Sequence, residues 1–196
     1  MFTLIDSYQE GLSIGSYLSQ YLCNYYLSFA YRLLETQYKC FYTHVIFYMD
    51  DFLILSRTKE DVAFVMEEVI KFFKEELNLT IKPNWELFPV DHKDEKGKRH
   101  GRPIDMMGYI IYRDHTVIRP GIFLRARRTY SRAVVYSEKY PHPRMPLFLS
   151  YKCVSYYGWL VNSDSKHFIF KNNVKKKVGL SKASISYYAK LKNGEN

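Results

Sequence analysis

Two adjacent carboxylates, Asp50 and Asp51, interrupt an otherwise apolar stretch, and they constrain the fold more than any other feature of the sequence. Residues 45–47 before them and residues 52–55 after them are apolar. Each run is too short for a globular helix but has the length of a buried strand. Residues 44–56 are therefore predicted to form a β-hairpin with the acids at or near its turn. An ordinary surface turn is the alternative interpretation, because aspartate is common in turns.

The paired acids also favour a metal site. Like charges that lie close together in a partly desolvated site repel, so either one pKa rises or a cation neutralises the pair. Hard carboxylate oxygens prefer Mg²⁺ or Mn²⁺ to zinc. We therefore expect Asp50, and then Asp51, to be ligands of Mg²⁺ (or Mn²⁺).

The charge of the chain indicates a polyanionic partner. Its 196 residues include 29 Lys and Arg against 20 Asp and Glu, for a net charge of +9. Such a balance is typical of proteins that bind nucleic acid. The aromatic fraction of 17% adds rings that can stack on bases, although filling of the core explains most of them. The hydrophobic fraction of 47% predicts a folded chain.

The cysteines and the hydropathy pattern bear on the compartment. Cys23, Cys40 and Cys153 form neither a disulfide framework nor a zinc site, so we expect buried free thiols in a reducing environment. No apolar stretch approaches the roughly 18 residues of a membrane helix, and the N-terminus lacks a secretion signal. The sequence therefore predicts a soluble, cytoplasmic protein with no membrane partner.

The periodicity of the first half predicts two helices around the hairpin. Apolar residues recur at helical spacing over residues 19–36, with Ser16 or Ser19 as candidate caps. Residues 59–77 form a strongly amphipathic pattern and are expected to cover one side of the sheet.

The second half predicts a further hairpin and then helices. Residues 91–103 form a charged turn region, and residues 104–112 and 116–118 are predicted to pair as strands. A basic helix is expected from Pro120 to Tyr140, and a second helix from Pro146 to Val161. We expect a domain boundary near residue 120, which separates an α/β part (1–120) from an all-α, basic part (121–196).

Two basic segments follow this boundary. Arg125, Arg128 and Arg132 share one helical face and would follow a phosphate backbone, a solvated basic face being the alternative. The last 34 residues hold eight Lys and two acids, and a solvated Lys-rich tail is the favoured interpretation.

The order of these elements resembles the palm and thumb of a reverse transcriptase. Tyr48-Met49-Asp50-Asp51 looks like the family's Tyr-x-Asp-Asp box, whose aspartates bind the two metals of nucleotidyl transfer. The resemblance implies an α+β fold, a partial polymerase palm with an antiparallel sheet and covering helices, followed by a helical thumb. By the same resemblance, Tyr48 and Met49 would pack near the primer end and the nucleotide.

Other segments match the family in the correct order. Residues 11–20, with Asn24 and residues 26–28, are similar to the motif before the catalytic hairpin, so Gly15, Ser19 and Gln20 would lie against nucleotide and template. Met107, Gly108 and Tyr109 resemble the primer-grip hairpin, and residues 119–132 resemble the start of the thumb. Residues 155–160 with Asp164 resemble thumb sequences of bacterial and phage members.

The resemblance also indicates a subgroup. Ile14-Gly15 followed by Ser19-Gln20 is closest to the pattern of the reverse transcriptases of diversity-generating retroelements, although other prokaryotic lineages share parts of it. Localisation would then be the cytoplasm of a bacterial cell or of a phage-infected host.

The implied activity is DNA synthesis on an RNA template from a DNA primer and deoxynucleoside triphosphates. The family's third metal-binding aspartate and its basic fingers have no counterpart here, since Asp6, Glu10 and Glu35 are the only acids before Tyr48. We therefore expect a C-terminal portion that is inactive alone and needs an N-terminal segment or an accessory protein. A non-catalytic nucleic-acid-binding module and a remnant without a stable fold are the alternative hypotheses.

Overall fold

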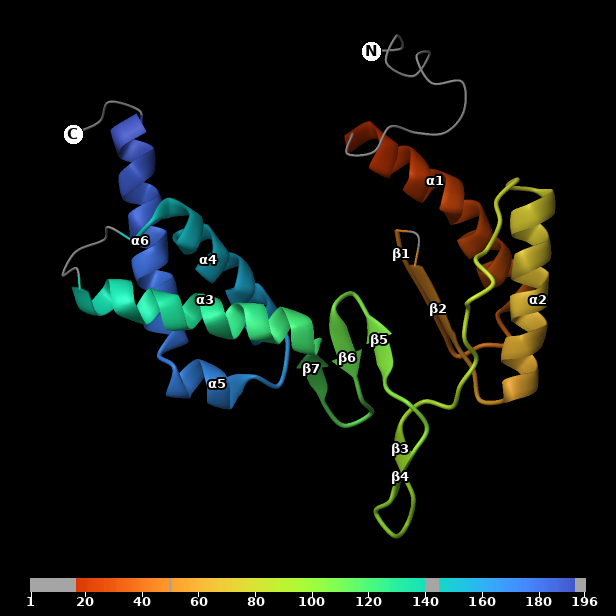
Figure 1. The fold of residues 1–196 in the computed structure, drawn as a ribbon. Coiled ribbons are helices and arrows are strands. Elements are labelled where there is room, and N and C mark those ends of the chain that lie inside the picture. The colour runs from red at the N-terminus through yellow and green to blue at the C-terminus, as the bar shows by residue number, and fades with distance from the viewer. Residues whose placement is uncertain (1–16, 50, 140–144, 193–196) are drawn as a thin grey trace. The chain divides into compact units, whose positions relative to one another are not determined.

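The computed structural model describes residues 17–49, 51–139 and 145–192, with the backbone only at 137–139. The chain divides into two units, residues 1–88 (unit 1) and residues 89–196 (unit 2). Each unit combines helices with small antiparallel sheets, so the expected α+β class is confirmed (Figure 1). The predicted boundary near residue 120 divides palm from thumb by function, and it stays a prediction.

The first described element of unit 1 is an α-helix that continues into a π-helical segment. Helix α1 spans Tyr17–Leu33, and a π-helical segment, η2, continues it over Leu34–Tyr38. The predicted helix is confirmed, but Ser19 as its cap is wrong because it lies inside the first turn of α1. The other candidate cap, Ser16, lies outside the described residues.

Helix α2 spans Lys59–Glu75 and has the predicted amphipathic character. Thr58 caps its N-terminus, since the hydroxyl oxygen of Thr58 accepts a hydrogen bond from the Asp61 amide at 3.2 Å. This bond satisfies one of the free amides of the first turn. The buried face carries side chains at helical spacing, namely Val65, Met66, Val69 and Phe73.

The hairpin of unit 1 is formed by β1 (His44–Tyr48) and β2 (Asp51–Leu55), as predicted. The two strands are antiparallel, and Tyr48 pairs with Asp51. Alternate residues of the hairpin pack against α1 and α2, because successive strand side chains point to opposite faces. The described apolar core of unit 1 has its buried members on the helices and just after α2: Ala30, Leu34, Val65, Val69, Phe73 and Leu77.

Unit 2 begins with short strands in two sheets. Strands β3 (His92–Lys93) and β4 (Arg99–His100) pair within the segment predicted as a charged turn. Strands β5 (Ile104–Met106), β6 (Tyr109–Ile111) and β7 (Thr116–Ile118) form an antiparallel three-stranded meander. A single strand over 104–112 is therefore wrong: Met107 and Gly108, both at positive φ, turn the chain between β5 and β6.

Charged side chains join the two sheets of unit 2. The Arg99 guanidinium donates to the Asp91 carboxylate at 2.8 Å and to the Asp114 carboxylate at 3.0 Å. Lys93 donates to Asp114 at 2.9 Å. Asp91 is buried, so the guanidinium satisfies a carboxylate that would otherwise be costly to desolvate. The β3–β4 hairpin is therefore held to the β6–β7 turn by polar contacts.

The described part of unit 2 continues with four helices. They are α3 (Pro120–Lys139), α4 (Leu147–Val161), α5 (Lys166–Lys171) and α6 (Val174–Lys192), and the first two agree with prediction. Tyr130 lies at the centre, where its hydroxyl donates to the Cys153 carbonyl oxygen at 2.6 Å. Burial raises the pKa of this phenol, so it stays a neutral donor. The buried core comprises Ile118, Tyr130, Ala133, Met145, Leu149, Cys153, Leu160, Val174 and Val178.

The prediction of a solvated Lys-rich tail is wrong. Helix α6 buries Val174 and Val178 against α3 and α4, and the buried face continues through Ser181 and Ser184. The hydroxyl of Ser181 donates to the Lys177 carbonyl at 2.8 Å, so the serine hydroxyl is satisfied inside the helix. Small serines allow close helix packing, but serine counts as a polar residue in a sequence pattern. The buried face of α6 was therefore not predicted from the sequence.

The remaining fold-level predictions concern membranes and thiols. None of the helices in the described part of the chain is long and apolar enough to cross a membrane. The three cysteines are free thiols. Cys153 is buried as expected, whereas Cys40 is exposed, so burial of all three is wrong.

Candidate polymerase site and nucleic-acid surfaces

The tip of the β1–β2 hairpin presents Asp51 away from the core of unit 1. Phe47 and its partner Phe52 pack on the core, so the next pair, Tyr48 and Asp51, faces the opposite side. Both members of this pair are exposed. Asp50, the first-ranked metal ligand, lies outside the described residues. The described carboxylate at the tip is therefore that of Asp51, and it is open to a ligand.

The turn at this tip is tight. The Tyr48–Asp51 pair leaves two residues in the loop, and Met49 takes a positive φ of 53°. Two-residue hairpin loops favour positive φ at their first position because this twist matches that of the strands. A residue with a Cβ pays about 1 to 2 kcal/mol for this conformation. The hairpin thus fixes Met49 beside the carboxylate.

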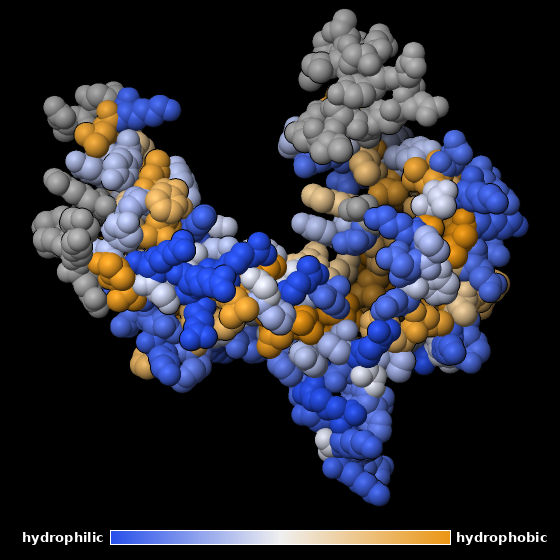
Figure 2. Space-filling model, in the orientation of Figure 1, coloured by the Kyte–Doolittle hydropathy of each residue, from blue (hydrophilic) through white to orange (hydrophobic). Residues whose placement is uncertain are grey.

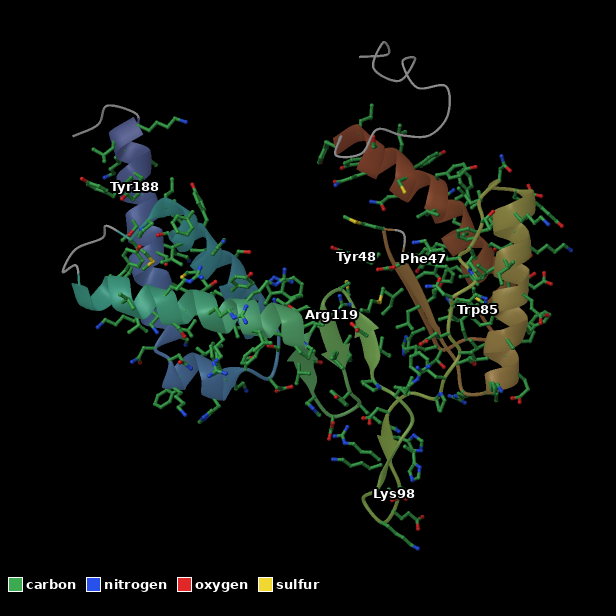
Figure 3. The ribbon with its side chains drawn as sticks, in the orientation of Figure 1. Phe47, Tyr48, Trp85, Lys98, Arg119 and Tyr188 are labelled. Atoms are coloured by element: carbon green, nitrogen blue, oxygen red, sulfur yellow. The ribbon has the colours of Figure 1, made fainter. Side chains whose placement is uncertain are left out.

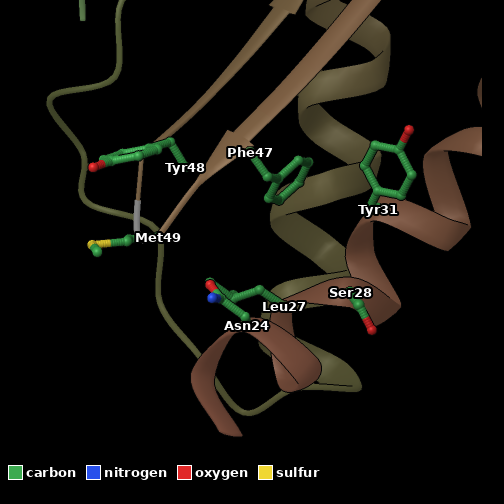
Figure 4. Close-up of a pocket in the computed structure, with 7 residues that line it drawn as sticks. All are labelled: Asn24, Leu27, Ser28, Tyr31, Phe47, Tyr48 and Met49. Atoms are coloured by element: carbon green, nitrogen blue, oxygen red, sulfur yellow. The ribbon is translucent and has the colours of Figure 1, made fainter. Parts of the chain in front are cut away.

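A cavity of about 390 Å³ lies between the hairpin tip and α1 (Figure 4). The Phe47 ring points toward α1 and meets the Tyr31 ring edge-on, with centroids 6.0 Å apart. Tyr48 and Met49 extend from the end of the hairpin, as Figure 4 shows, and Tyr48 is also labelled in Figure 3. The side of the cavity formed by α1 consists of Asn24, Leu27, Ser28 and Tyr31.

The cavity contains some predicted binding residues and misses others. Tyr48 and Met49 line it, whereas Ser19 and Gln20 do not. Gly15 lies outside the described residues. Asn24 and Ser28, which belong to the motif before the catalytic hairpin but were not named as individual binding residues, supply polar groups to the cavity. Helical spacing supports their place beside Gln20, because Gln20, Asn24 and Ser28 follow each other at intervals of four.

The described residues do not by themselves form a complete metal centre. No group of three or more His, Cys, Asp or Glu side chains gathers anywhere in the described part of the chain. Glu35 is bound elsewhere, since it accepts hydrogen bonds from Tyr42 at 2.8 Å and Lys39 at 3.2 Å. These contacts hold the pKa of the Glu35 carboxyl below its usual range. Among the described residues the tip offers the Asp51 carboxylate to a divalent cation, which would need further oxygen ligands.

The β5–β6 turn of unit 2 is tightly packed against helix α4. Gly108 has a φ of 78°, and a Cβ at this position would lie 2.5 Å from the ring of Trp159. Tyr109 packs on the same indole, with ring centroids 5.0 Å apart. Met107 is exposed at the tip of the turn. Of the three predicted primer-grip residues, Met107 is thus the one presented to a ligand, while Gly108 and Tyr109 anchor the turn to α4.

The same turn is tied to the start of α3. The amide of Arg119, a residue labelled in Figure 3, donates to the Gly108 carbonyl oxygen at 2.9 Å. The guanidinium of the same residue donates to the Asp105 carboxylate at 2.6 Å. Asp164, noted in the sequence, accepts from the Thr116 amide at 2.8 Å and so holds β7 to the α4–α5 loop. The Asp164 carboxylate therefore has a structural role in unit 2.

Helix α3 carries an arginine surface. A hollow of about 500 Å³ along it is lined by Arg127, Arg128 and Arg132 together with Leu124 and Ser131. Arg125 does not line this hollow, and its side chain donates to the Gly121 carbonyl oxygen of the preceding turn at 3.1 Å. Figure 2 shows hydrophilic side chains along this part of unit 2. Two of the three predicted backbone-binding arginines are therefore brought together, and Arg127 joins them.

A comparison with known families shows which family the chain belongs to. A family model described as "Reverse transcriptase (RNA-dependent DNA polymerase)" matches residues 6–111, from the segment before α1 to the end of β6. The chain belongs to the reverse transcriptase family. The match includes the acidic hairpin and the cavity beside it, and residues 112–196 lie beyond it. A search of curated proteins found no match to this chain.

Proposed function

We propose that this reverse transcriptase uses the β1–β2 tip to hold the divalent cation of nucleotidyl transfer during DNA synthesis on an RNA template. The observation that carries the proposal is the position of Asp51, which faces away from the apolar core and follows Asp50 directly. Mg²⁺ or Mn²⁺ suits these ligands. When bound, such a cation lowers the pKa of a primer 3′ hydroxyl and neutralises charge on the leaving phosphate oxygens.

The cavity beside the tip would receive part of the incoming deoxynucleotide or the primer end. Asn24 and Ser28 offer hydrogen bonds on one side, and Tyr48 and Met49 offer contact surface on the other. Held between them, a reacting group would have less freedom than in solution, which lowers the entropic cost of reaction. Gly15, Ser19 and Gln20 would extend this surface toward the base or template.

The second unit would bind the nucleic acid duplex. Met107 at the β5–β6 tip, with Gly108 and Tyr109 behind it, would contact the primer strand. Arg128 and Arg132 would neutralise backbone phosphates, joined by Arg127, and Arg125 stays a weaker candidate because it binds its own helix. Residues 1–120 would then act as the palm and residues 121–196 as the thumb.

Within the family, we place the chain nearest the prokaryotic reverse transcriptases of diversity-generating retroelements. The support is the sequence Ile14-Gly15 followed by Ser19-Gln20. The RNA template, DNA primer and deoxynucleoside triphosphates are the implied partners.

The metal site would need a further carboxylate from residues outside the described ones or from another polypeptide. Among the described residues the tip has Asp51, and Glu35 is occupied by Tyr42 and Lys39. The family's third metal-binding aspartate and its basic fingers have no counterpart in the sequence, so we expect the 196-residue chain alone to give no robust Mg²⁺-dependent primer extension. Strong extension by the purified chain, abolished in Asp51→Ala, would contradict this expectation.

Binding of Mn²⁺ tests the proposed cation site directly. The Met49 side chain lies in the turn beside the two acids, so its methyl NMR signal should be broadened by the paramagnetic ion. The double variant Asp50→Asn with Asp51→Asn should abolish the broadening, because amides are poorer ligands for hard cations. Equal broadening in the variant would contradict the proposal.

A non-catalytic nucleic-acid-binding role is a second candidate, favoured by the arginine hollow on α3. Binding would then fall steeply with salt, persist in EDTA and be unaffected by Asp51→Asn. Under the first proposal, the affinity for primer–template rises on addition of Mg²⁺, and Asp51→Asn removes that increase.

A further inference from the structure

A surface cavity of about 590 Å³ lies in unit 2 at the meeting point of α4, α5 and α6. Its apolar lining includes Leu160, which is buried, and Tyr157 and Ile169, which are half-buried. These side chains continue the core of unit 2 to the surface. The volume lies in the range of cavities that hold a small ligand or several side chains of a partner.

The edge of this cavity exposes large apolar groups. Phe170 is 86% exposed and Val161 is 52% exposed. A phenylalanine that is so open to water beside an apolar floor is typical of an interaction surface. By contrast, Phe168 in the same short helix packs on Phe123 and Tyr130 in the core, with ring centroids 5.0 Å and 6.3 Å away. Helix α5 therefore sends one ring inward and leaves the other available.

Positive charge surrounds the apolar floor. Lys166, Lys175 and Lys176 are exposed and line the cavity, and no acidic side chain is among its described lining residues. Residues 145–192 hold nine lysines and one acid, Asp164, whose carboxylate is bound to the Thr116 amide. A partner with negative charge would be attracted to this rim, and rim charges steer association.

We propose that this cavity docks an acidic amphipathic segment of another polypeptide, which inserts a large apolar side chain between α4 and α5. The aliphatic floor and the concave shape suit an apolar anchor, while the lysine rim suits flanking Asp or Glu residues. A nucleic acid is the poorer fit, because this rim offers lysines, whereas the guanidinium groups, which can pair with a phosphate through two hydrogen bonds, line the hollow on α3. The surface lies beyond the residues that match the reverse transcriptase family, so the proposal does not depend on polymerase activity.

Selection from a random peptide library displayed on phage tests the proposal with the full 196-residue chain as bait. The enriched peptides should combine aromatic or leucine residues with Asp and Glu. Their affinity, measured by fluorescence polarisation, should fall about ten-fold for Phe170→Ala, as expected for loss of an interface anchor. The double variant Lys175→Gln with Lys176→Gln should weaken binding and reduce its dependence on salt.

Matched variants separate this surface from general stickiness. Phe148→Ala removes another exposed ring of unit 2, and Lys182→Gln with Lys190→Gln removes two exposed charges of α6 outside the cavity. Neither should change peptide binding. The proposal is overturned if no peptide is enriched, if the enriched peptides lack acids, or if they bind Phe170→Ala as well as the unchanged chain. It is also overturned if a single-stranded oligonucleotide, and not the peptides, depends on Phe170 and Lys175.

Discussion

Tyr48 and Asp51 lie directly opposite each other at the end of the β1–β2 hairpin, on the face turned away from the apolar core of unit 1. The pair directly behind them, Phe47 and Phe52, packs on that core with ring centroids 5.3 Å apart. Because the two faces alternate, burying the phenylalanines exposes the carboxylate. The core therefore aims the candidate metal ligand.

Replacement of Met49 tests the tight turn at the hairpin tip. Its φ of 53° is poorly tolerated by β-branched residues, so Met49→Val should destabilise the hairpin by about 1 to 2 kcal/mol. Met49→Gly should stabilise it slightly, because glycine adopts positive φ without a Cβ penalty. Amide hydrogen exchange across β1 and β2 measures both changes. Equal protection in the valine and glycine variants would argue against a strained turn.

Gly108→Ala tests the packing of the β5–β6 turn on α4. The new Cβ would lie 2.5 Å from the Trp159 ring, so we expect a loss of about 2 to 4 kcal/mol from steric overlap plus backbone strain. Gly97→Ala is the matched control, since Gly97 has the same φ of 78° with nothing within 4 Å. It should cost only about 1 kcal/mol.

Urea unfolding measures these two variants in a Trp85→Phe background, where Trp159 fluorescence reports on unit 2. Similar losses for both alanine variants would show that the contact with Trp159 is unimportant.

Acid should weaken the junction between the β3–β4 hairpin and the β6–β7 turn. Lys93, His115 and Arg99 hold the pKa of the Asp114 carboxyl well below its usual range. A depressed pKa contributes stability above the unfolded-state value of about 3.9, and this contribution is lost as the pH falls further. Asp114→Asn should therefore lower the stability of unit 2 at neutral pH and reduce its loss in acid.

Urea midpoints between neutral and acidic pH test this behaviour. Glu95→Gln, which removes an exposed carboxylate from the β3–β4 hairpin, is the control. If Asp114→Asn keeps the full pH dependence of the unchanged chain, the network around Asp114 does not cause it.

The arginine hollow on α3 predicts the salt dependence of nucleic-acid binding. Replacing Arg127, Arg128 and Arg132 with Gln should weaken binding to a duplex and reduce the slope of log K against log salt by about 2 to 3. Lys98→Gln, at the exposed β3–β4 turn, should change neither quantity appreciably. A triple variant with an unchanged slope would exclude this surface as the phosphate contact.

Local patterns were enough to predict much of the framework. The short apolar runs on either side of Asp50 and Asp51 predicted the hairpin, and the apolar spacing over residues 59–77 predicted α2. Both signals lie within a short window of neighbouring residues, so they are visible in the sequence. The strand expected over 104–112 was wrong because a positive φ at Met107, unusual for this residue type, breaks it.

The sequence by itself determined the family motif, the basic charge, helices α1 to α4 and the β1–β2 hairpin, because each depends on residues that are neighbours along the chain. Tertiary structure alone decided which side chains come together: Asn24 and Met49 line the same cavity, Gly108 lies against Trp159, and the serine face of α6 lies in the core. These contacts join residues that are distant in sequence, and packing favours them for shape and close approach rather than for hydrophobicity. A preference for shape and close approach leaves no periodic pattern in the sequence, so these contacts could not be predicted from it.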